Sequence, residues 1–303
     1  MASPNLSEII TTTLRNRSKS LADNVTNHNA LLRRLSENGN ITTVTGREIV
    51  RELEYASNGT VGFYTGYETL DVSPSDVLTS ATFDYKQMAG NVTISGLEQI
   101  QNSGTEAIIN LLESRIGVLE KTMANTLSTS LYSDGTGSDG KEVGGLQLLV
   151  ADAGTGTVGG INSSTFTFFQ NAQTTATSSA FSTTNIQADM NTIYLSLVRG
   201  SDSPDLIMAD TNSYKAFLGS LQAIQRVTSD RVATSGFTSV QYLNSDVIFD
   251  DACPANKMYF LNTDYLRLEV AANRNFVPGE AKMSVNQDAM VTPMFWSGNL
   301  TVS

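Results

Sequence analysis

The sequence has 303 residues and a net charge of −11, and only 16% of its residues are charged. Serine, threonine and asparagine number 33, 35 and 24, so the surface is rich in hydroxyl and amide groups, which are easier to desolvate at an interface than charges are. Its one histidine (His28) and one cysteine (Cys253) exclude zinc sites built from several Cys and His residues and exclude an intramolecular disulfide.

Charge and hydrophobicity limit where the protein acts. The sequence has no run of about 18 apolar residues, and residues 1–6 lack the basic-then-apolar pattern of a signal peptide. We therefore expect a protein of the reducing cytoplasm without membrane contact. Residues 1–36 carry a net charge of +3 and the remainder carries −14. The acidic bulk argues against a dedicated nucleic-acid-binding protein.

The first third of the chain contains helical and extended patterns. Residues 7–35 have a thin apolar stripe at helical spacing, which fits either an arm lying on another subunit or a surface helix of the same domain. Residues 46–55 predict a second helix. Strand-like runs at 60–67 and 77–85 flank a turn near Pro74 and predict a long hairpin. Two strands alone are marginally stable in water, so the hairpin needs a surface to lie on.

The strongest periodic pattern covers residues 97–132. Apolar side chains recur every three or four positions from Ile108 to Leu127. This spacing predicts a helix of about 30 residues, roughly 45 Å long at the usual rise per residue. The mean helix has about 11 to 12 residues, so we interpret this one as a structural spar. It ends at a glycine-rich segment, residues 134–140.

The second half of the chain mixes short elements, and its overall class is α+β. Residues up to 182 are rich in glycine, serine and threonine and predict strands and loops. Residues 186–199 predict a helix. After it we expect a buried strand at 205–209, a helix cap at 210–212, a helix at 213–223, and strands at 240–249, 257–261, 266–271 and 290–302.

Glycine patterns do not predict a nucleotide site. The Gly-x-Gly-x-x-Gly matches at 135–140 and 154–159 neither follow a strand nor open a helix, as a dinucleotide site requires. Cys253 precedes a proline in a loop without a partner base, so we expect an inert thiol. His28 lies among asparagines and is expected to be a surface or interface residue.

Acidic clusters do not predict catalysis or metal binding. Asp134, Asp139 and Glu142 do not match the spacing of a calcium loop. Asp250 and Asp251 are neighbours in an extended segment, so they should point to opposite faces, remain solvated and not share a proton. We expect no catalytic, cofactor-binding or metal-binding residue, and we expect that the protein is not an enzyme.

The elements themselves indicate an oligomeric building block. A basic arm, a hairpin without a core of its own and a very long helix bury their apolar faces on neighbours. We expect charge reversal at Arg51 to impair assembly without changing the circular dichroism of the monomer. The residues expected at the interface are the hairpin aromatics Phe63, Tyr64, Tyr67, Phe83 and Tyr85 and the flanking charges Arg47, Arg51, Glu52 and Glu54.

Four stretches, in this order, resemble the major capsid proteins of tailed bacteriophages with the HK97-like fold. Residues 59–96 resemble the extended E-loop, and residues 97–132 resemble the spine helix of the peripheral domain. The sequence GGLQLLV at 144–150 resembles the segment that often follows this helix. Residues 204–214 and 259–266 resemble the strand, helix and strand of the axial domain. The specificity lies in the order and spacing, and none of the stretches is a catalytic signature.

The resemblance implies a structural subunit of an icosahedral head. Such subunits self-assemble into hexamers and pentamers around double-stranded DNA, which the inner face meets without sequence specificity. The implied divisions are an N-terminal arm (1–45), an E-loop (46–96), a peripheral domain with the spine helix (97–202), an axial α+β domain (203–265) and return strands to the peripheral domain (266–303).

The implied partners are other copies of the chain, a portal and decoration proteins, in a virion assembled in the host cytoplasm. Only about 45 residues precede the E-loop, so we expect a separate scaffolding protein or none. Lys86 has no assignable Asn or Glu partner, so no crosslinking chemistry is assigned. The alternative is a Ser/Thr/Asn-rich surface or adhesin-like structural protein, against which the missing export signal and the long helix argue.

Overall fold

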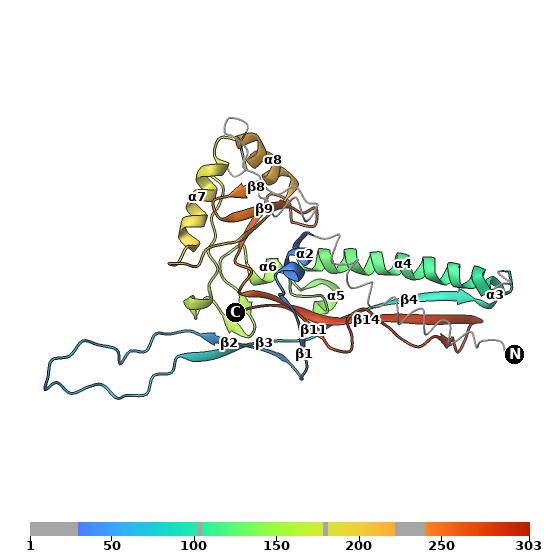
Figure 1. The fold of residues 1–303 in the computed structure, drawn as a ribbon, viewed down its shortest axis with the longest axis horizontal. Coiled ribbons are helices and arrows are strands. Elements are labelled where there is room, and N and C mark those ends of the chain that lie inside the picture. Colours follow the sequence, from blue (N-terminus) through green and yellow to red (C-terminus); the bar gives the residue numbers. More distant parts are fainter. Residues whose placement is uncertain (1–29, 102–104, 178–180, 222–239) are drawn as a thin grey trace.

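The computed structural model describes residues 30–101, 105–177, 181–221 and 240–303. Most of the N-terminal helix expected at 7–35, and His28 with it, lies outside these residues. The molecule is elongated (Figure 1). A long helix and a sheet extend to one end, a hairpin projects at the other, and a compact unit lies to one side.

A six-stranded sheet forms the long axis, and its organising strand is β14 (Ala289–Val302). This strand pairs antiparallel with β4 (Lys86–Ser95) and with β11 (Leu266–Ala271). The strands expected at 266–271 and 290–302 are therefore confirmed. The remaining members are β1 (Ile41–Val44), parallel to β11, and the short strands β12 (Val277–Pro278) and β13 (Lys282–Met283), both paired with β14.

The expected long helix is present as α3 (Gly96–Gln101) followed by α4 (Thr105–Ser130), which has 26 residues. Helix α4 packs along β4 and buries Ile116, Met123 and Leu127. Gly90 of β4 permits this close approach, because a Cβ at residue 90 would lie 2.4 Å from Cδ1 of Leu119. The apolar periodicity that predicted the helix is therefore the face that packs on the sheet.

The compact unit contains a four-stranded sheet in the order β10 (Met258–Leu261), β7 (Leu206–Ala209), β9 (Ser245–Phe249) and β8 (Val240–Tyr242). All four residues of β7 are buried because both faces of the sheet are covered. Ile207 packs in a cluster with the helices α7 (Ile186–Leu197) and α8 (Thr211–Ser220). Leu206 and Met208 belong instead to the large core that includes α4. Asp210 caps α8, as expected, by accepting hydrogen bonds from the backbone N–H of Asn212 and Ser213.

The helix predicted at 46–55 is wrong, because this segment forms strand β2 (Ile49–Glu54). Ile49 and Leu53 are buried, while Val50, Glu52 and Glu54 are exposed, a period of two residues. Pairing with β3 (Leu78–Phe83) selects the strand. The strand expected at 60–67 is also wrong: residues 55–77 form a loop without a described strand or helix.

Asp250 contradicts the expectation of a solvated side chain. It is buried in the turn after β9, where its carboxylate accepts a hydrogen bond from the Tyr132 hydroxyl (2.9 Å) and one from the Ala252 N–H (3.0 Å). The turn directs this carboxylate inward against the end of α4, a contact between residues far apart in sequence. Asp251, its neighbour, is exposed.

One remaining described element is α2 (Ala30–Glu37), which precedes β1. The others lie between α4 and α7 in the chain: α5 (Gly137–Gly140), α6 (Leu146–Leu149), β5 (Thr157–Val158), β6 (Ile161–Asn162) and the 3-10 helix η1 (Thr167–Phe169). No described helix has the length and apolar character that a membrane crossing requires.

Candidate interaction surface

The hairpin β2–β3 carries a loop, residues 55–77, that projects away from the rest of the molecule (Figure 1). All residues of this loop are exposed except the half-buried Thr60 and Val77. Phe63 and Tyr67 are fully accessible, and Val72 is 91% exposed. Soluble monomers rarely expose large apolar patches, so the loop is a candidate surface for contact with another protein.

Side chains of the loop fix its backbone locally. The Glu68 carboxylate accepts hydrogen bonds from the Thr65 N–H (3.0 Å) and hydroxyl (2.8 Å), and the Asp71 carboxylate accepts one from the Ser73 N–H (3.0 Å). Such bonds build turns without a core. They also lower the pKa of Glu68 and of Asp71, because they favour the ionised form. The loop thus presents shaped turns and two ionised carboxylates.

The base of the hairpin is anchored to the central sheet by a charge pair. Arg51 Nη1 of β2 lies 3.3 Å from Glu269 Oε1 of β11, and Arg51 Nη2 donates to the Ser303 hydroxyl at 3.3 Å. Burial is the main cause that lowers the pKa of Arg51 and raises the pKa of Glu269, although each charge stabilises the other. This pair holds the projecting hairpin at a fixed place on the sheet.

The five predicted aromatic residues divide into two groups. Phe63, Tyr64 and Tyr67 are exposed on the loop, where another subunit could cover them. Phe83 is buried and Tyr85 is half-buried, and both pack in the core of their own chain. The prediction of inter-subunit contact therefore depends on the three loop residues.

The four predicted charged residues also divide. Arg47, Glu52 and Glu54 are exposed and remain candidates for contacts between subunits. Arg51 is engaged within its own chain by Glu269. Reversal of its charge would place two acidic groups together and disturb the subunit itself, so Arg51 does not give an assembly-specific test.

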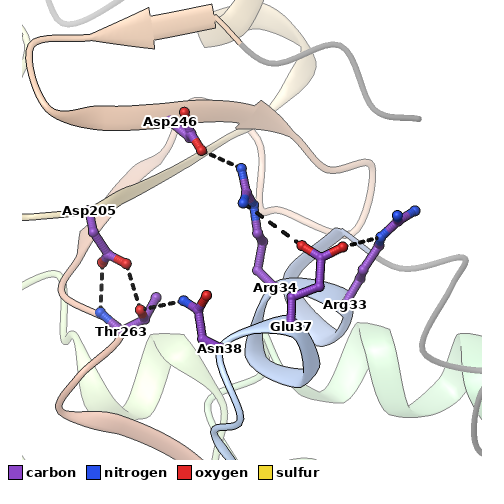
Figure 2. A network of polar contacts seen from close by, with 7 residues as sticks. All are labelled: Arg33, Arg34, Glu37, Asn38, Asp205, Asp246 and Thr263. Carbon is purple, nitrogen blue, oxygen red and sulfur yellow. Dashed lines mark hydrogen bonds and ion pairs between the residues drawn. The ribbon is translucent and has the colours of Figure 1, made fainter. Parts of the chain in front are cut away.

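A polar network joins the compact unit to α2 (Figure 2). The Asp205 carboxylate accepts hydrogen bonds from the N–H (2.7 Å) and hydroxyl (2.6 Å) of Thr263, so the start of β7 is tied to the exit from β10. Asn38 Nδ2 donates to the same Thr263 hydroxyl at 2.8 Å. The Arg34 guanidinium pairs with the Asp246 carboxylate of β9. Sequence reasoning missed this network, since its members are far apart along the chain.

A cleft of about 1020 Å³ lies beside this junction. It is lined by the end of β2, by α7 and by segments that include Phe168 and Tyr265. Its polar groups contact one another: Lys257 Nζ lies 2.6 Å from Asp152 Oδ2, and the Tyr265 hydroxyl donates to Asp202 at 2.9 Å. Across the described ranges, no three His, Cys, Asp or Glu side chains are arranged to hold a metal ion.

The described architecture is similar to that of known shell proteins. A model of the family described as SU10 major capsid protein matches residues 87–284, more than half of the chain. The chain belongs to the SU10 major capsid protein family. The resemblance to phage major capsid proteins stated from the sequence is therefore confirmed. The comparison with curated proteins gives no match.

Solved structures share the fold at low sequence identity. The capsid asymmetric unit of cyanophage A-1(L) has a TM-score of 0.67 at 16% identity, with 87% of this chain and 86% of that chain covered. The capsid of Myoviridae phage XM1 has a TM-score of 0.54 at 10% identity, with coverages of 88% and 87%. The SrpI encapsulin complex of Synechococcus elongatus PCC 7942 has a TM-score of 0.57 at 10% identity, with coverages of 89% and 83%.

Family membership gives this major capsid protein its role. It is a structural, non-enzymatic subunit that self-assembles into the capsid lattice of a bacteriophage head and is located in the virion. The adhesin-like alternative is therefore set aside.

Proposed function

We propose that this subunit has the HK97-like division of labour and forms hexamers and pentamers of an icosahedral head. In this assignment the hairpin β2–β3 with loop 55–77 is the E-loop, and α4 is the spine helix of the peripheral domain. The unit around β7 is the axial domain, which meets its copies at the axis of each capsomer. The assignment is supported by the order of these elements and by their arrangement in Figure 1.

The packing supports two adjustments to the expected domain boundaries. Strand β4 pairs with β14 over ten residues, so residues 86–95 belong with the peripheral domain rather than with the E-loop. Helix α7 packs against α8 and the four-stranded sheet, so we place it with the axial domain. We propose an E-loop over 46–85 and an axial domain from about residue 181 to 265.

One observation carries the proposed role of the hairpin. Loop 55–77 exposes Phe63, Tyr64 and Tyr67 while it makes few contacts with its own subunit. Burial of such side chains contributes about 25 cal/mol per Å² of apolar surface, and this surface can be buried only on another molecule. We propose that the loop lies over an adjacent subunit of the same shell.

The assembled shell would enclose double-stranded DNA and form in the host cytoplasm. The acidic bulk of the chain suits an inner face that does not bind DNA tightly, because tight binding would hinder packing and release. A portal would occupy one vertex of the shell. Scaffolding or decoration proteins would be separate chains that bind to it.

The test compares loop variants with a matched control. Phe63→Ser and Tyr67→Ser should leave the thermal midpoint of the subunit unchanged, because both side chains are fully exposed, yet they should strongly reduce the yield of shells in negative-stain electron microscopy. Val118→Ser removes an exposed apolar side chain from α4, away from the hairpin, and should have the smaller effect. Wild-type chain that stays monomeric with its phage partners would contradict the role as shell subunit. Normal shells from both loop variants would contradict the role of the loop.

A further inference from the structure

The base of the hairpin holds more positive charge than its own chain neutralises. On β11, Arg267 and Glu269 lie on one face, while Leu266, Leu268 and Val270 point into the core. Arg51 approaches the same face and pairs with Glu269. Arg267 is near enough to act on the charges of both Arg51 and Glu269, although only Arg51 forms an ion pair with this carboxylate.

The two guanidinium groups are incompletely satisfied. The Nε atoms of Arg51 and Arg267 are both buried, and neither has a hydrogen-bond partner among the described residues. Within the same residues, no acidic group forms an ion pair with Arg267, which is half-buried. A half-buried cation with an unpaired donor is costly unless an anion completes it. Arg267 therefore has a positive charge that no described acidic side chain pairs with.

Loop 55–77 carries an excess of negative charge, which complements the arginines. Glu68, Asp71 and Asp76 are the charged residues of 55–77, and the stretch contains no Lys or Arg. Glu68 and Asp71 are fully exposed and accept hydrogen bonds from within the loop that favour their ionised state. The loop extends away from its own β11 (Figure 1), and no ion pair among the described residues joins these carboxylates to Arg51 or Arg267 of their own chain.

We propose that Arg267, beside Arg51, binds an acidic side chain, Glu68 or Asp71, from the loop of a second copy of this chain. The inference rests on the proposed function, in which the loop lies over an adjacent subunit, and it names where the tip of that loop docks. The contact would complete an alternating set of two arginines and two carboxylates. It would also cover the base of one hairpin with the tip of another.

The experiment measures assembly and subunit stability separately. Arg267→Gln removes the surplus charge while the Arg51–Glu269 pair remains, so the thermal midpoint of the unassembled subunit should stay within about 2 °C of the wild type. The protein concentration that the variant needs for assembly should rise about tenfold or more. This concentration should also depend less on salt than that of the wild type. Lys121→Gln, which neutralises an exposed lysine on α4, is the matched control and should change neither quantity.

A double-mutant cycle identifies the partner. Glu68→Gln with Asp71→Asn should weaken assembly as Arg267→Gln does, and the combination of all three should be no worse than either set alone. Additive effects, or coupling of Arg267 to Asp76→Asn instead, would overturn the assignment. A fall in the thermal midpoint that parallels the loss of assembly would show a role within the subunit only. Wild-type protein that does not assemble would reject the proposed function itself, a result distinct from these.

Discussion

Arg34 of α2 forms an ion pair with Asp246 of β9 across the junction of the two units, although 212 residues separate them in the sequence (Figure 2). Each side chain is only 12% exposed. Helix α2 itself is anchored on the other side, because Leu31, Leu32 and Leu35 are buried in the large core. The pair therefore fixes the compact unit against a helix that belongs to the body of the molecule.

We predict that Arg34→Gln lowers the free energy of unfolding by about 1 to 3 kcal/mol, because it leaves a half-buried carboxylate without its partner. Urea unfolding, with Asp246→Asn and the double variant, measures the coupling between the two side chains. Arg47→Gln is the control: the Arg47 side chain is 94% exposed and pairs with the neighbouring Glu48, so its loss should cost less than about 0.5 kcal/mol. Equal effects of the two arginines would contradict the prediction.

Gly145, the second residue of the GGLQLLV segment, is required by close backbone contact rather than by flexibility. A Cβ at this residue would lie 2.4 Å from the carbonyl oxygen of Ser130 and 2.5 Å from that of Leu131, where α4 ends. The N–H of the next residue, Leu146, donates to the Leu131 carbonyl at 2.7 Å, so this approach is part of the fold. All of these contacts would be with backbone atoms, which cannot move aside as the end of a flexible side chain can.

Gly145→Ala should therefore destabilise the subunit by about 1 to 3 kcal/mol and lower the yield of soluble protein. Gly62→Ala is the matched control, because a Cβ there meets no atom within 4 Å and the residue is on the projecting loop. Thermal unfolding of the two variants measures the difference. A Gly145→Ala protein as stable as the wild type would show that the segment shifts without cost.

Local periodicity predicted the parts of the fold whose apolar side chains face one neighbour. Helix α4 is the example, since its apolar positions recur at helical spacing along its length. The segment around Ile49 and Leu53 misled the prediction, because a spacing of four residues is compatible with a helix and also with a strand. Pairing of β2 with β3, nearly thirty residues along the chain, selects the strand.

The candidate site was predictable only in its exposed part. Phe63 and Tyr67 were predicted from the sequence to be interface residues, and both side chains are exposed in the structure. Phe83 has the same side chain as Phe63, and nothing in the local sequence indicates that it is buried by its own chain. Arg267, Asp205 and Thr263 acquire their roles from strand neighbours more than thirty residues distant, so tertiary structure was needed to identify them.

The single thiol, Cys253, can report on the solvent accessibility of the core around it. The residue is buried, and its thiol contacts the Lys257 carbonyl at 3.8 Å. Burial, followed by the charges of Asp210 and Asp250, raises the pKa of Cys253 to about 12 from an ordinary value of 9.0. The folded thiol is therefore protonated at every pH at which thiol reagents are normally used, which agrees with the inert thiol expected from the sequence.

We predict that native protein reacts with a thiol reagent at pH 8 only as fast as it unfolds, since the thiolate is the reactive species. Urea at the unfolding midpoint should restore the rate of a free cysteine. Because the pKa of Cys253 is raised in the folded state, the contribution of its thiol to the free energy of unfolding is complete below about pH 9. This contribution is lost as the pH rises toward 12. The free energy of unfolding should therefore decrease over that range, and Cys253→Ala should reduce the slope. Rapid labelling of the native subunit at pH 8 would show that this part of the unit opens without unfolding.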